Sequence, residues 1–90
     1  MMEEDVDGAT RDLNRARQSL VEELQAIIYY DERISASKNK ELKSVLMHNR
    51  DDEKEHASLL IEWLRRNDPE FEKELKEILF SNKAFKDLWD

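Results

Sequence analysis

Three side chains in this sequence are of the types that bind transition metals in helical proteins. Glu53 and His56 form a Glu-x-x-His pair on one face of an expected helix, and Glu23 stands alone in the stretch before it. Two-metal carboxylate sites in four-helix bundles take one Glu from each of two helices and one Glu-x-x-His from each of the other two. The chain carries half of that set. We therefore expect a second copy to complete it, on the two-fold axis of a dimer.

The composition favours a single all-α domain. The chain has 90 residues, of which 41% are charged and 39% hydrophobic, with one Gly and one Pro. So few turn residues favour helices, and so polar a chain can enclose only a small core without partner subunits. The net charge of -7 argues against nucleic acid and anionic membranes as partners and is compatible with handling cations.

The sequence shows no sign of export. The start, Met1-Met2-Glu3-Glu4-Asp5, lacks the basic and apolar regions of a signal peptide, and no apolar run approaches the length of a membrane span. There is no cysteine, hence no disulfide framework. We expect a soluble cytoplasmic protein without membrane partners.

Two long helices account for most of the chain. Residues 1–8 are acidic and expected to be mobile, and residues 9–90 should form one helical domain that a second copy completes to a four-helix arrangement. The first helix is predicted over 9–36 and the second over 40–66, with Ser37 or Asn39 as N-cap. A connection this short predicts an antiparallel hairpin.

A shorter C-terminal helix is predicted after Asp68 and Pro69, which suit the N-cap and the first helical position. Its apolar face would be Phe71, Leu75, Ile78 and Leu79. An apolar tail follows and should pack on another helix or on a neighbouring subunit: Phe85, Leu88 and Trp89.

Heptad-like spacing predicts which side of each long helix faces its partner. The expected seam of the first helix is Leu13, Ala16, Leu20, Glu23, Ile27, Tyr30 and Ile34, widened by Leu24 and Ile28. The expected seam of the second is Leu42, Leu46, Asn49, Glu53, His56, Leu60 and Trp63. Glu23 lies 13 residues before Ala36 and Glu53 lies 13 after Lys40, so the hairpin should bring them to similar heights.

Other interpretations of the Glu53–His56 segment are a solvated charge run and a buried Glu–His ion pair that fixes register. The seam phase argues against the first, because Glu53 and His56 cannot face water unless the whole stripe moves. Carboxylates with one imidazole per metal suit iron, manganese or zinc. Iron in a di-iron site is the favoured assignment, with calcium, manganese or zinc as alternatives at the same or outer sites.

The segment His48-Asn49-Arg50-Asp51-Asp52-Glu53-Lys54-Glu55-His56, with Glu22 to Arg33 before it and Glu62 to Asp68 after it, resembles the encapsulated ferritins. These are short ferritin-like proteins carried as cargo inside encapsulin nanocompartments. The resemblance covers roughly residues 15 to 80. It implies a hairpin with a smaller third helix, a ferroxidase centre formed by two chains, and a ring of dimers, typically a decamer. Localisation inside an encapsulin shell follows from it as an expectation.

The resemblance also assigns residues. It implies Glu23, Glu53 and His56 as iron ligands, with Tyr30 beside the centre. Two outer groups resemble secondary cation sites of the family: Glu22, Gln25 and Tyr29 on one face, and His48, Asp52 and Glu55 on another. Gln25 stands where the family usually has an acid, which weakens the first group by one charge. The last six residues, 85–90, show no Gly-Ser-Leu-type peptide of the kind that docks family members to the shell.

Together these features predict Fe(II) oxidation by oxygen or peroxide at a subunit-shared di-iron centre, supplying iron for storage. Glu23 of each chain would bridge the irons, and Glu53 and His56 would complete one iron each. Rival interpretations are a structural or adaptor hairpin and a redox-inert divalent-metal module. Metal should also promote assembly, because empty carboxylates at an interface repel one another.

Overall fold

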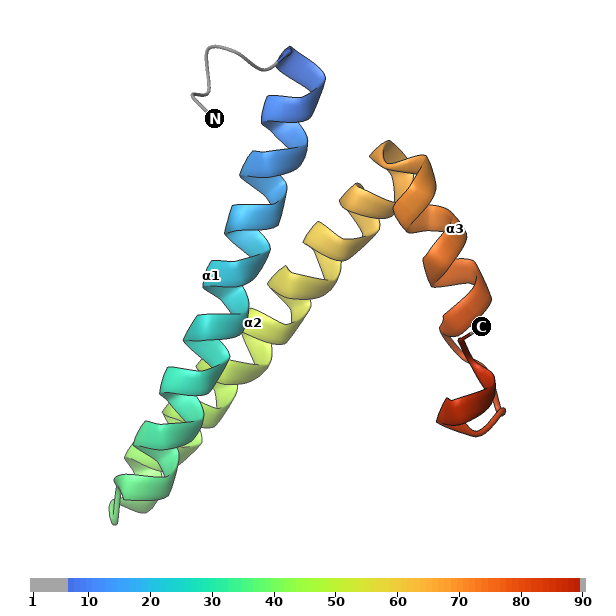
Figure 1. Ribbon diagram of the computed structural model, residues 1–90. Coiled ribbons are helices and arrows are strands. Elements are labelled where there is room, and N and C mark those ends of the chain that lie inside the picture. The colour runs from blue at the N-terminus through green and yellow to red at the C-terminus, as the bar shows by residue number, and fades with distance from the viewer. Residues whose placement is uncertain (1–6, 90) are drawn as a thin grey trace.

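The computed structural model describes residues 7–89 as an antiparallel helical hairpin with a third helix that folds away from it (Figure 1). The elements are α1 (Gly8–Ala36), α2 (Lys40–Asn67), α3 (Pro69–Ile78) and a 3-10 turn, η2 (Phe85–Asp87). No strand occurs in this part of the chain. The all-α class is confirmed, and the predicted bounds of both long helices lie within one residue of those observed. Of the acidic segment 1–8, residues 1–6 lie outside the described part, and Gly8 already belongs to α1.

Each helix begins at a side-chain cap, which explains why these boundaries were predictable from local sequence. Asp7 accepts a hydrogen bond from the Thr10 amide at 3.0 Å. Asn39 accepts one from the Leu42 amide at 3.0 Å, so Asn39 rather than Ser37 is the cap of α2. Asp68 caps α3 through the Phe71 amide at 3.2 Å, with Pro69 at the first helical position as predicted.

The contact between α1 and α2 follows the predicted seam on α1 and departs from it on α2. All seven predicted α1 seam positions are half-buried, but Leu24 and Ile28, which were predicted to widen the seam, are exposed. On α2 the prediction was wrong for Leu42, His56 and Trp63, which are exposed, whereas Ala57 and Leu64 are buried. A stripe of less exposed α2 residues consists of Lys43, Leu46, Arg50, Glu53, Ala57, Leu60 and Leu64, and the predicted Asn49 is half-buried beside it. At 100° per residue, this stripe is rotated by roughly 50° from the predicted one.

The reason for this difference is that α2 is apolar on both flanks of Glu53. Leu42 and Trp63 lie on one flank, and Ala57 and Leu64 lie on the other. Apolar periodicity therefore permits two orientations of α2 about its axis. In the observed orientation, Arg50, Ala57 and Leu64 lie on the side of α2 that faces α1.

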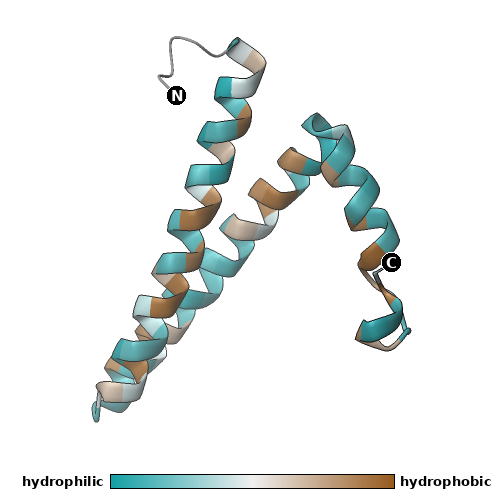
Figure 2. Cartoon of the chain, viewed as in Figure 1, coloured by the Kyte–Doolittle hydropathy of each residue, from teal (hydrophilic) through white to brown (hydrophobic). Residues whose placement is uncertain are grey.

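The chain alone is open rather than compact. Its radius of gyration is 17.1 Å, against about 12 Å for a compact chain of this length. Among the described residues only Ala57 and Leu64 are buried hydrophobics, with 5% and 3% of their surface exposed. Apolar segments alternate with polar ones along both long helices, and many remain exposed (Figure 2). The small core matches the expectation for so polar a chain.

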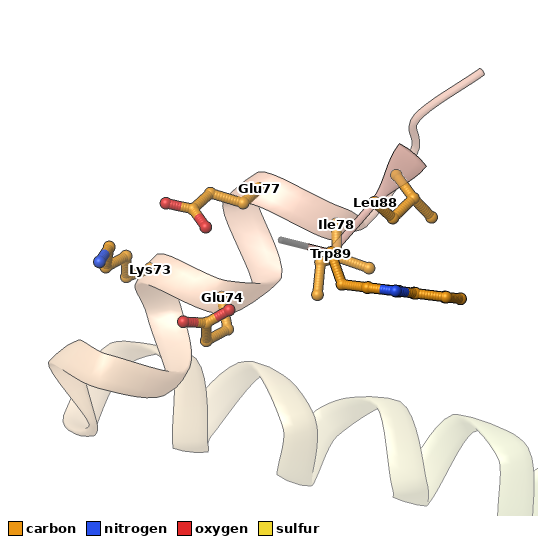
Figure 3. Close-up of a pocket in the computed structure, with 6 residues that line it drawn as sticks. All are labelled: Lys73, Glu74, Glu77, Ile78, Leu88 and Trp89. Atoms are coloured by element: carbon orange, nitrogen blue, oxygen red, sulfur yellow. The ribbon is translucent and has the colours of Figure 1, made fainter. Parts of the chain in front are cut away.

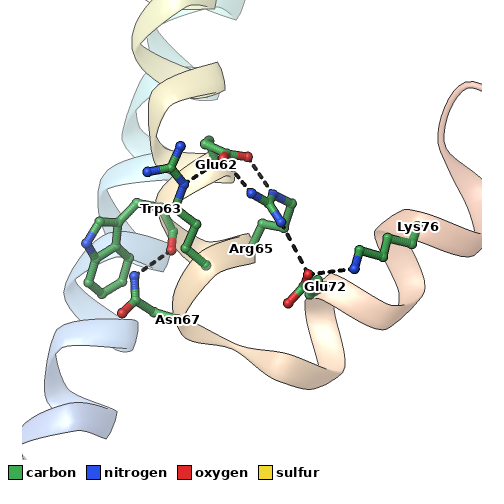
Figure 4. A network of polar contacts seen from close by, with 7 residues as sticks. Glu62, Trp63, Arg65, Asn67, Glu72 and Lys76 are labelled. Atoms are coloured by element: carbon green, nitrogen blue, oxygen red, sulfur yellow. Dashed lines mark hydrogen bonds and ion pairs between the residues drawn. The ribbon is translucent and has the colours of Figure 1, made fainter.

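A polar network fixes the elbow between α2 and α3 (Figure 4). Arg65 donates to Glu62 within α2 at 2.6 and 2.7 Å and to Glu72 on α3 at 3.3 Å. Lys76 lies 2.9 Å from the same Glu72 carboxylate. Arg17 on α1 pairs with Asp68 at 3.0 Å, so the elbow is also tied to the first helix.

The C-terminal segment lies against α3. Leu88 and Trp89 gather beside Ile78 at a hollow of about 490 Å³, which is also lined by Lys73, Glu74 and Glu77 (Figure 3). Phe80 takes a positive φ of 59° at the end of α3 and is fully exposed. Phe85 and Trp89 also stay largely exposed, so the tail packs on a helix of its own chain only through part of its apolar surface.

Candidate metal centre

Three metal-binding side chains meet between the two long helices. Glu23 comes from α1, and Glu53 and His56 come from successive turns of α2. One ligand atom from each lies within 4.8 Å of the others. Within residues 7–89, no other group of three such side chains gathers in this way. The arithmetic that placed Glu23 and Glu53 at one height of the hairpin therefore agrees with the structure.

The imidazole points one nitrogen at both carboxylates. His56 Nδ1 lies 3.2 Å from Glu53 Oε2, which is a hydrogen-bond distance with the Glu53 oxygen as acceptor when Nδ1 carries a proton. The same Nδ1 lies 3.5 Å from Glu23 Oε2, and this contact does not meet the geometry of a hydrogen bond. Three donor atoms of two kinds thus converge on one small volume.

Glu23 supplies the most informative atom. Its Oε2 is buried and has no hydrogen-bond partner, and it is the one such side-chain atom found in the described residues. A carboxylate oxygen that loses water without gaining a donor is costly, so it calls for a specific explanation. A cation held by Glu23, Glu53 and His56 would supply the missing partner. The donor set of two carboxylates and one imidazole fits iron, manganese or zinc.

Beyond the two carboxylates, the flank of α2 that carries His56 is open and partly apolar. His56 is half exposed, and residues on the same flank of α2 include Leu59 and Trp63, one and two turns further on. Val45 continues this flank toward the loop, and Val45, Leu59 and Trp63 are 55%, 63% and 39% exposed. An exposed apolar flank with a metal ligand at its centre is suited to contact another protein surface.

The other predicted site residues lie around the centre without forming a second cluster among the described residues. Tyr30 is half-buried two turns after Glu23, and the Arg33 guanidinium lies over its ring at 5.8 Å from the centroid. His48 pairs with Asp52 at 3.4 Å, but Glu55 does not join them to make a third ligand.

The outer face of α1 is occupied by hydrogen bonds between side chains. Gln25 donates to the Tyr29 hydroxyl at 2.9 Å, and Gln18 donates to Glu22 at 3.2 Å. Gln25 and Tyr29 are thus in contact with each other, whereas Glu22 pairs with Gln18.

Arg50, one turn from the metal ligand Glu53, was not predicted from the sequence to have a role near the site. Arg50 lies one turn before Glu53, is only 20% exposed, and donates to Asp31 on α1 at 2.9 Å and to Asp51 at 3.2 Å. The hydrogen bond with Asp31, and next that with Asp51, raise the pKa of Arg50. The sequence did contain a sign of this role. Arg50 is three residues before Glu53 and shares a heptad spacing with Ala57 and Leu64.

Comparison with known proteins identifies the family. The model of the family described as EncFtn-like matches residues 1–82. The chain belongs to the EncFtn-like family. The resemblance inferred from the Glu53–His56 segment is confirmed.

Relatives and a solved structure agree with this assignment. An encapsulated ferritin-like protein of Rhodospirillum rubrum is 50% identical over 76% of the chain. A ferritin-like protein of Thermotoga maritima is 42% identical over 90%. The chain spans 71% of the Thermotoga protein but only 49% of the Rhodospirillum protein. An encapsulin nanocompartment cargo protein, EncC, of Myxococcus xanthus is 41% identical over 68% of this chain. The match covers 47% of the length of EncC.

The fold has a close counterpart in a crystal structure. Protein NE0167 of Nitrosomonas europaea matches with a TM-score of 0.89 and 53% sequence identity, covering 94% of this chain and 93% of that one. Within residues 7–89 no helix is both long and apolar enough to span a membrane.

Proposed function

We propose that this EncFtn-like chain is a ferroxidase, which oxidises Fe(II) to Fe(III) at a di-iron centre shared between two subunits. The observation that carries the proposal is the convergence of Glu23, Glu53 and His56 around a buried carboxylate oxygen without a partner. Membership in an iron-related, encapsulated ferritin-like family supports iron as the metal. The ligand types alone would also suit manganese or zinc.

The three side chains would bind the iron and set its charge balance. Two chains contribute four carboxylates, two of Glu23 and two of Glu53, and these balance the four positive charges of two Fe(II) ions. The carboxylates attract Fe(III) more strongly than Fe(II), which favours oxidation. When bound, each Fe(II) supplies one electron to dioxygen or peroxide. His56 Nδ1, aimed at both carboxylates, would complete each half of the site.

The second copy would contact the apolar flank that carries His56. Val45, Leu59 and Trp63 are exposed there and would lose contact with water in a dimer. A two-fold axis beside His56 would then bring two copies of the three ligands together. Two further features remain predictions: a role for Tyr30 beside the centre and a decameric ring. The same holds for secondary metal binding by Glu22, Tyr29, His48, Asp52 and Glu55.

The aerobic oxidation rate of Fe(II) tests the proposal. Purified wild type is compared with His56→Ala, with buffer, and with Ser58→Ala as a matched control, because Ser58 is exposed two residues from His56. We expect catalysis by the wild type and the control and none by His56→Ala. Metal binding without faster oxidation would instead identify a redox-inert metal module. If the protein neither bound metal nor oxidised iron, it would be a structural hairpin.

We further propose an encapsulin shell as partner, with the chain acting in the shell interior within the cytoplasm. The names of the Rhodospirillum and Myxococcus relatives support this partner. Co-expression with an encapsulin shell protein, followed by purification of intact shells, should recover the chain inside them. Empty shells would contradict the assignment of this partner.

A further inference from the structure

Arg50 has no place in the proposed chemistry, yet it links the two long helices one turn away from the metal ligand Glu53. It joins Asp31 of α1 to Asp51 of its own helix and is mostly shielded from water. A partly buried guanidinium that donates to two carboxylates has a defined orientation, because its planar group fixes the directions of its hydrogen bonds. Arg50 therefore constrains how α2 is turned relative to α1.

The geometry of α2 links this constraint to the metal ligand. Arg50 and His56 each lie three residues from Glu53, on opposite sides of it in the sequence. At 100° per residue they fall about 60° to either side of Glu53 around the helix axis. Turning α2 so that Arg50 meets α1 necessarily turns His56 outward. In this orientation His56 is half exposed and Glu53 still faces Glu23.

Apolar packing alone leaves the orientation of α2 open. In the observed orientation Ala57 and Leu64 are buried against α1. In the alternative orientation, rotated by roughly 50°, Asn49, His56 and Trp63 would face α1 instead. That orientation would bury the large Trp63 side chain but would enclose His56 within one hairpin. It would also break the ion pair between Arg50 and Asp31.

We infer that Arg50, through its ion pair with Asp31, is a positioning residue that selects the orientation of α2 in which His56 faces outward toward a second chain. The bearing of this inference on metal binding rests on the proposed function. The orientation itself does not, because it is a property of the hairpin without metal.

Thiol reactivity in the metal-free full-length chain tests the orientation directly, since the sequence contains no cysteine of its own. Single cysteines are introduced at Ala57→Cys, buried against α1, and at Asn49→Cys, half-buried on the His56 flank. Each is combined with Arg50→Gln, with Asp31→Asn, or with the control Arg66→Gln, which removes an exposed ion pair to Glu62 at the far end of α2. Reaction rates with a disulfide reagent are measured, and circular dichroism checks helicity.

We expect loss of the Arg50–Asp31 pair to speed modification at position 57 and to slow it at position 49. The change should be up to roughly fivefold, the ratio that one partly exposed ion pair can supply. Arg66→Gln should change neither rate. Faster modification at both positions would indicate simple loosening of the hairpin and would overturn the inference, as would unchanged rates in both Arg50→Gln and Asp31→Asn.

A second measurement reads out the metal site. Visible absorption of bound Co(II) reports its ligand set, and its titration gives the affinity. Arg50→Gln is expected to weaken Co(II) binding and Arg50→Lys to restore part of it, while Arg66→Gln behaves as wild type. Equal Co(II) spectra and affinities for wild type and Arg50→Gln would overturn the positioning role. Absence of Co(II) and Fe(II) binding by wild type would instead contradict the proposed function, and the thiol rates would still decide the orientation.

Discussion

Glu23 is held in an arrangement that is unfavourable without a metal. Its Oε2 lies in the interface between α1 and α2 with no hydrogen-bond donor, and the Glu53 carboxylate shares the same small volume around His56 Nδ1. Like charges brought together out of water oppose folding. Such local instability is common at functional sites, where binding chemistry takes precedence over stability.

The substitution Glu23→Gln should therefore separate stability from metal binding. Removing one negative charge relieves its repulsion with Glu53, and the amide NH₂ can donate to that carboxylate. We expect the melting temperature of the metal-free protein to rise by a few degrees, as about 1 kcal/mol would produce in a domain of this size. Metal affinity should fall sharply. A lower melting temperature together with unchanged metal binding would contradict this account of Glu23.

At the residue scale the sequence was sufficient to find the three ligand types, because Glu and His at seam spacing are exceptional in an apolar stripe. Spacing from the loop also brought Glu23 and Glu53 to one height. Sequence could not show that His56 lies at the edge of the seam. That position depends on the ion pair of Arg50 with Asp31, whose members are 19 residues apart and on different helices.

The helices themselves were predictable from local signals. Asn39 and Asp68 cap α2 and α3 with their own side chains, and Pro69 begins α3 where a missing amide proton does no harm. The rotation of α2 was not predictable, because both of its flanks offer apolar residues. Only contacts between the helices determine whether Ala57 and Leu64 on one flank, or Trp63 on the other, are buried against α1.

At the elbow, an ion-pair network connects α2 to α3, with Arg65 paired to Glu62 of its own helix and to Glu72 of α3. Hydrogen bonds from Arg65 and then Arg66 lower the pKa of Glu62 from its ordinary 4.5 to about 2. Because this pKa is lowered by folding, the stabilisation is complete above pH 4.5. It is lost as the pH falls through about 2.

A carboxyl NMR titration of Glu62 checks the part of this network that lies within α2, because Glu62, Arg65 and Arg66 all belong to that helix. Arg65→Ala removes the strongest donor, so the pKa of Glu62 should rise toward its ordinary value while Arg66 keeps part of the shift. Lys86→Ala, an exposed cation in the C-terminal turn, serves as the control and should leave the titration unchanged. A Glu62 pKa near 4.5 in the wild type would show that the Glu62–Arg65 contact does not persist in solution.

At the scale of the whole molecule, the single chain exposes much of its apolar surface. Few side chains are buried, and apolar residues on both long helices and on the C-terminal segment remain in contact with water. The acidic ligands lie beside the half-exposed His56, where a second copy without metal would bring four carboxylates together. Assembly and metal binding should therefore be coupled.

Sedimentation velocity measures this coupling. Metal-free protein should sediment as a smaller species than protein loaded with Fe(II) under anaerobic conditions. Added chelator should reverse the change, since the ligands would again repel one another. His56→Ala should stay small with or without iron, whereas Ser58→Ala should behave as wild type. A distribution of species that does not respond to iron would argue that assembly depends on apolar contacts alone.

The most direct test of the shared centre is native mass spectrometry of the anaerobic Fe(II)-loaded protein. The account predicts iron in species of two or more chains, two ions for each pair, and none in the single chain. Glu53→Ala should remove this iron while the helical content is retained. Iron bound by single chains as tightly as by pairs, or retained in Glu53→Ala, would contradict a centre built from Glu23, Glu53 and His56 of two subunits.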